Sequence, residues 1–138
     1  MTLTDAGPLI ALISTDEADQ IAYLQALSNL SLPLETTWPA FAEAMCILRR
    51  VSGCIAQRAL WRLISTNRIV LVELSTSALA TSARLMDQYG DRPMDLANAT
   101  LVAYAEENGH REIFTLDSDF LMYRIRGRQR FVVIPKMY

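Results

Sequence analysis

The chain has 138 residues, of which 51% are hydrophobic and 20% are charged, and its 13 Lys and Arg against 15 Asp and Glu give a formal net charge of -2. This length predicts one domain, residues 1–138, with a core that needs no cross-links. The composition excludes a disordered chain, and two cysteines without Cys or His partners at ligand spacing exclude a disulfide scaffold and disfavour a zinc site.

The first half of the chain is predicted to alternate short strands with helices. Residues 1–5 form a short strand, and Gly7-Pro8 then opens an apolar run. Residues 14–17 are typical of a break followed by a helix start, and that helix continues to about residue 30. Residues 32–37 are a strand candidate, and Pro39 fits the first turn of a helix that runs to about residue 51.

The second half repeats this alternation. Ser52-Gly53 separates the preceding helix from one over residues 54–65. The remaining predicted elements are a strand over 68–74, a helix over 75–89, a helix over 95–108 that Gly109 ends, and strands over 112–116 and 131–134. Helices alternating with short β-branched strands predict an α/β domain with a mostly parallel sheet.

Acidic residues follow two of the predicted strands. Asp5 ends the first strand and Asp117 ends the strand I-F-T-L, so both should reach the carboxyl edge of the sheet, where α/β folds bind ligands. Glu43 lies inside an apolar helix that otherwise suits burial. Asp95 and Asn98 are three residues apart and share a helix face. These side chains predict one polar site at one sheet edge.

Such a cluster needs a positive charge. Two carboxylates about 4 Å apart repel by roughly 4 kcal/mol at an effective dielectric constant near 20. Oxygen ligands without His favour Mg²⁺ or Mn²⁺ over zinc, and a carboxylate-held cation can clamp a phosphate and activate water. The pattern therefore predicts hydrolysis of a phosphodiester. The only histidine is His110, so a mechanism with a His base would have to use it.

Each acidic residue also has a structural explanation. Asp5 and Asp95 fit helix N-caps, which is the favoured single role for Asp95, and Asp117-Ser118-Asp119 fits a polar turn. Glu43 requires a partner if it is buried, and an ion pair with an Arg would serve. The joint pattern is more specific than any of its members.

Four segments resemble the PIN-domain family and, within it, the VapC-type toxins of bacterial toxin–antitoxin pairs. They are L-T-D-A-G-P-L-I-A-L, T-T-W-P-A-F-A-E-A-M, P-M-D-L-A-N-A-T-L-V-A-Y-A-E-E-N-G and I-F-T-L-D-S-D-F. The resemblance implies a three-layer α/β/α domain with a short-stranded parallel sheet, an Mg²⁺ or Mn²⁺ site and RNA cleavage. It also implies a homodimer and a cognate antitoxin. Asp5, Glu43 and Asp117 match the family's acids, and Asp119 lies close by.

One position departs from the family pattern. The family usually has Asp where this chain has Asn98, in M-D-L-A-N-A. Asn keeps a carbonyl ligand but loses the charge and cannot act as a base. Three explanations stay open: Asp95 compensates, the chain is a non-cleaving member that binds RNA or an antitoxin, or the sequence is an engineered inactive form.

Arginines alternate in R-I-R-G-R-Q-R, and a strand would align Arg124, Arg126, Arg128 and Arg130 on one face as a ridge that contacts RNA phosphates. Gly127 instead predicts a turn, which would break that ridge. An edge that pairs with acidic antitoxin residues is a further reading of the same arginines.

The helices over residues 39–65 carry more apolar side chains than one small domain can easily bury, which indicates a dimer or antitoxin surface.

The sequence lacks the motifs of two other phosphoryl-transfer classes and the patterns of secreted or membrane proteins. A phospho-accepting receiver domain needs an Asp after its third strand, where this chain has Leu74-Ser75. A phosphatase with an aspartyl nucleophile needs two Asp residues spaced by one residue after its first strand, and the segment D-A-G-P lacks the second Asp. The beginning of the chain lacks a signal-peptide pattern, and no run of 18 apolar residues occurs. A cytoplasmic protein without a membrane partner is expected.

Overall fold

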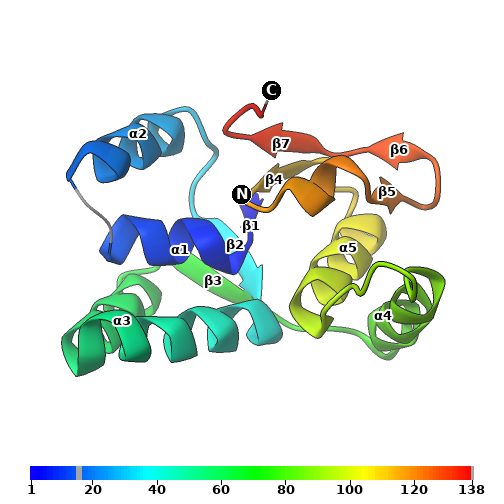
Figure 1. Ribbon diagram of the computed structural model, residues 1–138, viewed down its shortest axis with the longest axis horizontal. Coiled ribbons are helices and arrows are strands. Elements are labelled where there is room, and N and C mark those ends of the chain that lie inside the picture. The colour runs from blue at the N-terminus through cyan, green and yellow to red at the C-terminus, as the bar shows by residue number, and fades with distance from the viewer. Residues whose placement is uncertain (15–16, 138) are drawn as a thin grey trace.

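The protein is described from a computed structural model that covers residues 1–14 and 17–137. Its centre is a five-stranded parallel sheet in the order β3-β2-β1-β4-β7 (Figure 1). The strands are β1 (Thr2–Thr4), β2 (Leu34–Thr37), β3 (Ile69–Val72), β4 (Glu112–Phe114) and β7 (Val132–Ile134). β1 pairs with both β2 and β4, with Leu3 opposite Glu35 and Ile113. The first strand is therefore central, and the residue that follows it reaches the middle of the carboxyl edge.

Alternating side chains direct the two faces of the sheet into two cores. Leu3, Ile113 and Val133 join one apolar cluster, and Leu34, Ile69 and Phe114 join the other. Because side chains of a strand alternate between faces, buried residues on both faces require a helical layer on each side. The result is the three-layer α/β/α arrangement that the family resemblance implies, and its parallel sheet confirms the α/β class predicted from the sequence.

Helices cover both faces. On the face of the Phe114 cluster lie α1 (Ala6–Ile13), α2 (Glu17–Ser28) and α3 (Trp38–Ser65). On the face of the Ile113 cluster lie α4 (Thr76–Gln88) and α5 (Leu96–Asn108), which pack against each other (Figure 1). Eight residues of α5 are buried, from Ala97 to Ala105. α5 is thus the more buried helix of its layer.

Most predicted elements are present, and the differences have physical causes. The apolar run after Gly7-Pro8 is α1, and the carboxylate of Asp5 caps its first turn. The predicted break between two helices is a kink inside α3 at Gly53, where φ is 72° and ψ is -161°. A backbone of this kind is essentially open to glycine alone. The predicted break at Thr15 and Asp16 lies outside the described residues.

Three elements after β4 were not predicted. They are the short 3-10 helix η1 (Ser118–Leu121) and the antiparallel strands β5 (Arg124–Ile125) and β6 (Gln129–Arg130). Arg126 and Gly127 have φ of 53° and 72°, so the chain turns between β5 and β6. The predicted ridge of aligned arginines is therefore wrong, and the turn at Gly127 is confirmed.

In the part of the chain that the structure describes, no helix combines the length and the apolar character needed to cross a bilayer.

Candidate active site

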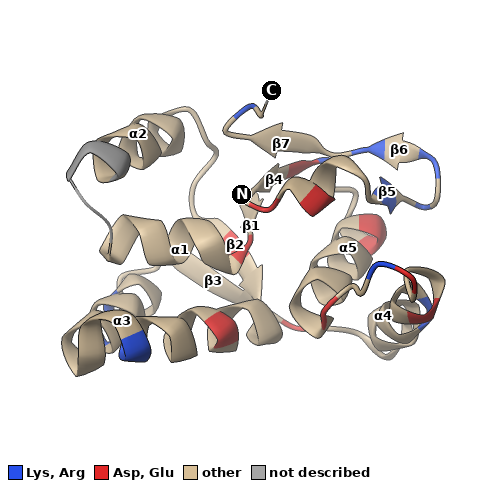
Figure 2. Ribbon diagram, viewed as in Figure 1, with Lys and Arg blue, Asp and Glu red and all other residues tan. Residues whose placement is uncertain are grey.

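A cleft of about 270 Å³ opens at the carboxyl edge of the sheet, and we call it the acidic cleft. Its polar lining comes from four separate places: the end of β1, the second turn of α3, the start of α5 and the segment after β4. The lining residues are Asp5, Ala6, Gly7, Ile10, Glu43, Ile47, Asp95, Asn98, Leu116 and Asp117. Among the described residues no Lys, Arg or His lines it, although basic residues are plentiful elsewhere on the molecule (Figure 2). The cleft therefore concentrates negative charge without a compensating side chain.

Asp5 is the most buried acid of the cleft, with 6% of its surface exposed. Its Oδ1 accepts a hydrogen bond of 2.7 Å from the Ala6 N–H, and its Oδ2 accepts one of 2.9 Å from the Thr115 hydroxyl. Burial raises the pKa of Asp5 to about 6; these two hydrogen bonds oppose the rise, and the charges of Asp117 and Asp95 add to it. Asp5 is thus both a helix cap and a carboxyl group close to protonation at neutral pH.

Asp117 and Asn98 are directly linked. The side-chain amide of Asn98 donates to Asp117 Oδ2 at 3.0 Å, and Asp117 Oδ1 accepts from the Asp119 N–H at 2.9 Å. The Asp117 N–H in turn donates to Thr115 Oγ1, which connects it to Asp5. With 4% exposure, Asn98 is as buried as Asp5. An amide at this position supplies a proton donor to a carboxylate where a second carboxylate would repel it.

Glu43 lies on the α3 side of the cleft. It is partly exposed, because residues 43 and 47 of α3 face the opening, whereas other residues of the same helix are buried. Partial burial raises the pKa of Glu43, and the charges of Asp95, Asp5 and Asp117 raise it further. Among the described residues no Arg forms an ion pair with Glu43. The structural explanation of this residue therefore lacks its partner.

Asp95 and Asp119 have structural partners. Asp95 lines the cleft but also caps α5, since its Oδ1 accepts from the Asn98 N–H at 2.8 Å. The predicted N-cap is thus confirmed. Asp119 does not line the cleft, and its carboxylate pairs with Arg92 at 3.1 Å. Its expected place among the metal ligands has no support in this arrangement.

The donor atoms of the cleft suit a cation, but they do not lie close enough together to surround one. Within residues 1–14 and 17–137, no three Asp, Glu, His or Cys side chains are grouped tightly enough to surround a metal ion. The donors are nevertheless all oxygens, two carboxyl pKa values are raised partly by mutual repulsion, and no basic side chain offsets the charge. This donor set suits Mg²⁺ or Mn²⁺, and the side chains that could hold such a cation are Asp5, Glu43, Asp117 and Asn98.

His110 and the predicted RNA-binding arginines lie elsewhere. His110 Nε2 is 3.0 Å from Oε2 of the buried Glu35 in β2, so it serves no role in the cleft. The guanidinium of Arg124 donates to the carbonyls of Leu121, Met122 and Tyr123. It stabilises the end of η1, and the expectation that Arg124 contacts RNA phosphates stays a prediction.

Thr115 and Tyr123 complete the site, and the sequence reasoning missed both. Thr115 bridges the two strand-end acids through hydrogen bonds. The buried Tyr123 hydroxyl lies 3.5 Å from the Asn98 amide nitrogen, and burial raises the pKa of Tyr123. The T-L-D sequence after β4 was the available signal for Thr115, because residues 115 and 117 lie on the same side of an extended segment.

Comparison with known proteins places this architecture in a family. The model of the PIN domain family matches residues 2–126, so the chain belongs to the PIN domain family. The resemblance to the VapC type is also confirmed. A relative from Mycobacterium tuberculosis, "Ribonuclease VapC26", is 26% identical over 134 residues, which is 96% of this chain and 99% of the relative.

Solved structures show the same fold. The sarcin–ricin loop cleaving toxin VapC20 of Mycobacterium tuberculosis has a TM-score of 0.77 at 15% identity, covering 86% of this chain and 92% of its own. A chain of a toxin–antitoxin complex from Klebsiella pneumoniae has a TM-score of 0.64 at 19% identity, covering 86% and 88%. FitAcB from Neisseria gonorrhoeae has a TM-score of 0.59 at 15% identity, with the same coverage.

Proposed function

We propose that this chain is a metal-dependent endoribonuclease that acts in the cytoplasm as the toxin of a toxin–antitoxin pair. The observation that carries the proposal is the convergence of Asp5, Glu43 and Asp117 on one cleft that no basic side chain lines. The ribonuclease and toxin names of the relatives support the same reaction. When bound, Mg²⁺ or Mn²⁺ supplies the positive charge that activates water and stabilises the phosphoryl oxygens.

The residues of the chain have distinct tasks in this proposal. Asp5, Glu43 and Asp117 hold the cation by their carboxylates, and Asn98 contributes its amide oxygen. Thr115 keeps the two strand-end carboxylates in register by its hydrogen bonds to both segments. In the protein without the cation the pKa of Asp5 is about 6, so near this pH the cation competes with a proton for the Asp5 carboxylate. Asn98 has no proton to exchange at this pH, so it contributes to the site only as a neutral ligand.

RNA cleavage in Mn²⁺ and in chelator tests the proposal on three proteins: the chain itself, Asp5→Asn and Asn98→Asp. We expect metal-dependent cleavage by the chain and a loss of at least about 100-fold in Asp5→Asn, the scale seen when one group that stabilises transition-state charge is removed. Asp87→Asn, an exposed acid on α4, is the matched control. Cleavage that survives Asp5→Asn contradicts the assignment.

Asn98→Asp separates the remaining explanations. If only Asn98→Asp cleaves, the fold is a nuclease disarmed at one ligand. If both proteins cleave, Asp95 or water covers the missing charge. If neither cleaves any RNA that is offered, the nuclease proposal is overturned in favour of a module that binds without cutting.

The proposed protein partners are an antitoxin and a second copy of the chain. The Klebsiella pneumoniae structure is a toxin–antitoxin complex, and in this chain the kinked α3 exposes Val51 by 64%, Ile55 by 77% and Trp61 by 49%. Burial of Ile55 in a homodimer would contribute roughly 2 kcal/mol per protomer. Light scattering tests the dimer: we expect twice the chain mass for the protein and a shift toward one chain mass for Ile55→Asp. A monomer at micromolar concentration contradicts it.

A further inference from the structure

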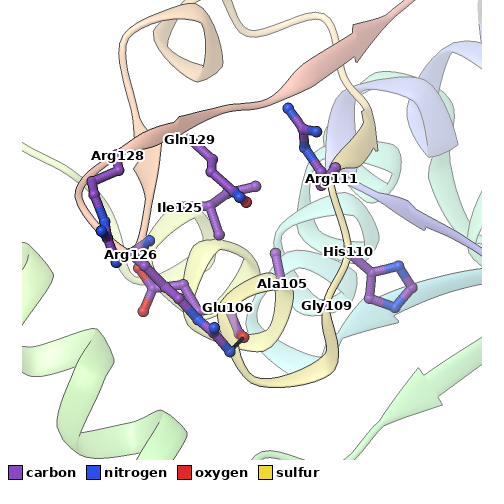
Figure 3. Close-up of a pocket in the computed structure, with 9 residues that line it drawn as sticks. All are labelled: Ala105, Glu106, Gly109, His110, Arg111, Ile125, Arg126, Arg128 and Gln129. Carbon is purple, nitrogen blue, oxygen red and sulfur yellow. Dashed lines mark hydrogen bonds between the residues drawn. The ribbon is translucent and has the colours of Figure 1, made fainter.

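A second pocket, of about 430 Å³, lies at the far end of α5 from the acidic cleft, and we call it the basic pocket. Its lining is shown in Figure 3 and consists of Ala105, Glu106, Gly109, His110, Arg111, Ile125, Arg126, Arg128 and Gln129. The turn between β5 and β6 supplies Arg126 and Arg128 on one side, and the segment before β4 supplies Arg111 on another. Three arginines therefore line one cavity.

The two sites are separated along α5. Asn98 in the first turn of the helix lines the acidic cleft, whereas Ala105, Glu106 and Gly109 at its end line the basic pocket. At 1.5 Å per residue, the rise from Asn98 to Gly109 is about 16 Å. The basic pocket thus cannot be part of the carboxylate site.

One of the three arginines is held in place by the protein. The Arg126 N–H donates to Glu106 Oε1 at 2.7 Å, and Arg126 Nη2 donates to the Glu106 carbonyl at 3.0 Å. These bonds join the turn to the last residues of α5 and give the pocket a defined wall. Glu106 is also its single acidic lining residue, and it is 4.0 Å from Arg84 outside the pocket. The negative charge of Glu106 is therefore partly compensated by Arg84 and by the hydrogen bond from the Arg126 N–H.

The other two arginines have no acidic partner. Within the described parts of the chain, Arg111 and Arg128 form no ion pair, and His110 directs Nε2 to Glu35. The pocket therefore holds more positive than negative charge, and its polar groups are mainly donors. The C-terminus of α5 carries a partial negative charge of about 0.5, which disfavours a bound anion. The hydrogen bond from Arg126 to the Glu106 carbonyl offsets part of this charge. The positive charges of Arg111 and Arg128 are together larger than the remainder.

We infer that the basic pocket binds a backbone phosphate of the RNA strand, at a distance from the scissile phosphate. The inference rests on the proposed function for its substrate. Guanidinium forks match phosphate oxygens, and three donors around one cavity suit a group with several acceptor oxygens better than a single carboxylate. A contact 16 Å or so from the carboxylates along α5 would strengthen substrate binding without taking part in the chemistry.

The test measures RNA binding in chelator, where cleavage does not interfere. Fluorescence anisotropy of a labelled single-stranded oligoribonucleotide is followed against salt for the chain and for the double variant Arg111→Gln/Arg128→Gln. Loss of this one phosphate contact should lower the slope of log Kd against log salt by about 0.7 and weaken binding at low salt about tenfold. Arg58→Gln/Arg68→Gln removes the same charge from exposed positions outside the pocket and should leave the slope unchanged.

Each outcome decides the inference. An unchanged slope in the pocket variant, or an equal loss in both double variants, overturns it. Calorimetry with adenosine monophosphate is the second arm: if the pocket variant loses only this binding and keeps RNA affinity, the pocket serves free phosphates and the inference fails. Thermal melting of both variants checks that they fold. If the chain binds RNA through the pocket but never cleaves it, the nuclease proposal fails and the phosphate site stands.

Discussion

The two ends of α5 carry opposite chemistry, and both agree with the direction of the helix. At the N-terminal end, Asp95 caps the helix beside Asp5, Glu43 and Asp117. At the C-terminal end, Arg126 donates to the carbonyl of Glu106. A helix has partial positive charge at its N-terminus and partial negative charge at its C-terminus, so each end favours the side chains gathered there.

The ends differ in how far their charge is balanced. In the acidic cleft burial raises the pKa of Asp5 and Glu43, and repulsion between the carboxyl groups raises both pKa values further. In the basic pocket the arginines are exposed, so water screens them. Unbalanced charge therefore lowers the free energy of unfolding in the cleft but has little effect on it in the pocket. Changes in the cleft should accordingly alter stability more than changes in the pocket.

The largest expected stability effect comes from Asp5. Its pKa of about 6 in the folded protein, against 3.8 ordinarily, means that the folded state holds the proton more tightly than the unfolded state. In chelator, this group's contribution to the free energy of unfolding should therefore fall by about 3 kcal/mol as the pH rises from below 4 to above 6.

Asp5→Asn should remove this fall and be more stable than the parent at neutral pH. Urea unfolding across that range, with Asp87→Asn as the control, measures the difference. If the free energy of unfolding depends on pH in the same way in the parent and in Asp5→Asn, the pKa of Asp5 is not raised in the folded protein.

A smaller effect is expected from Asn98→Asp. The change replaces the 3.0 Å hydrogen bond to Asp117 with a carboxylate facing a carboxylate. We expect a loss of about 2 kcal/mol in chelator, the scale of a hydrogen bond to a charged group, and a larger gain in melting temperature on adding Mn²⁺ than the parent shows. Asn29→Asp, at an exposed position, is the control. If Mn²⁺ raises the melting temperature of Asn98→Asp and of the parent equally, residue 98 takes no part in cation binding.

The smallest effect concerns the turn that builds the basic pocket. Gly127 has φ of 72°, so Gly127→Ala should lower the free energy of unfolding by about 1 kcal/mol and weaken RNA binding severalfold by displacing Arg128. Gly127→Asn should be milder, because Asn tolerates the left-handed region better than Ala. Chemical unfolding and the anisotropy assay report the two effects. An Asn variant as impaired as the Ala variant would show that backbone conformation is not the cause.

Local sequence signals predicted much of the fold and part of the site. Apolar β-branched runs identified the strands, and Gly53 and Gly109 marked the helix break and a helix end, where both have φ of 72°. Asp5 and Asp117 could be paired in advance because parallel strands end at one edge. The bond from the Asp5 N–H to the Phe114 carbonyl, 2.9 Å long, shows that adjacency directly.

The remaining features depend on contacts between distant segments. Nothing near Arg111 in the chain indicates that it would share a pocket with Arg128, and nothing near Asp119 indicates Arg92 as its partner. Glu43 shows the same limit, because helix periodicity marks its face as apolar but does not reveal that the face opens on a cleft.

The sequence by itself therefore determined the α/β class, the position of most strands and helices, and the edge at which the acids meet, since these follow from local periodicity and from the direction of parallel strands. Only the tertiary structure decided which charges are balanced. It paired Asp119 with Arg92 and Arg126 with Glu106, it buried Asp5, and it left Arg128 without an ion pair to any described residue. Charge balance depends on distances of a few ångströms between segments far apart in the chain, which no local pattern encodes.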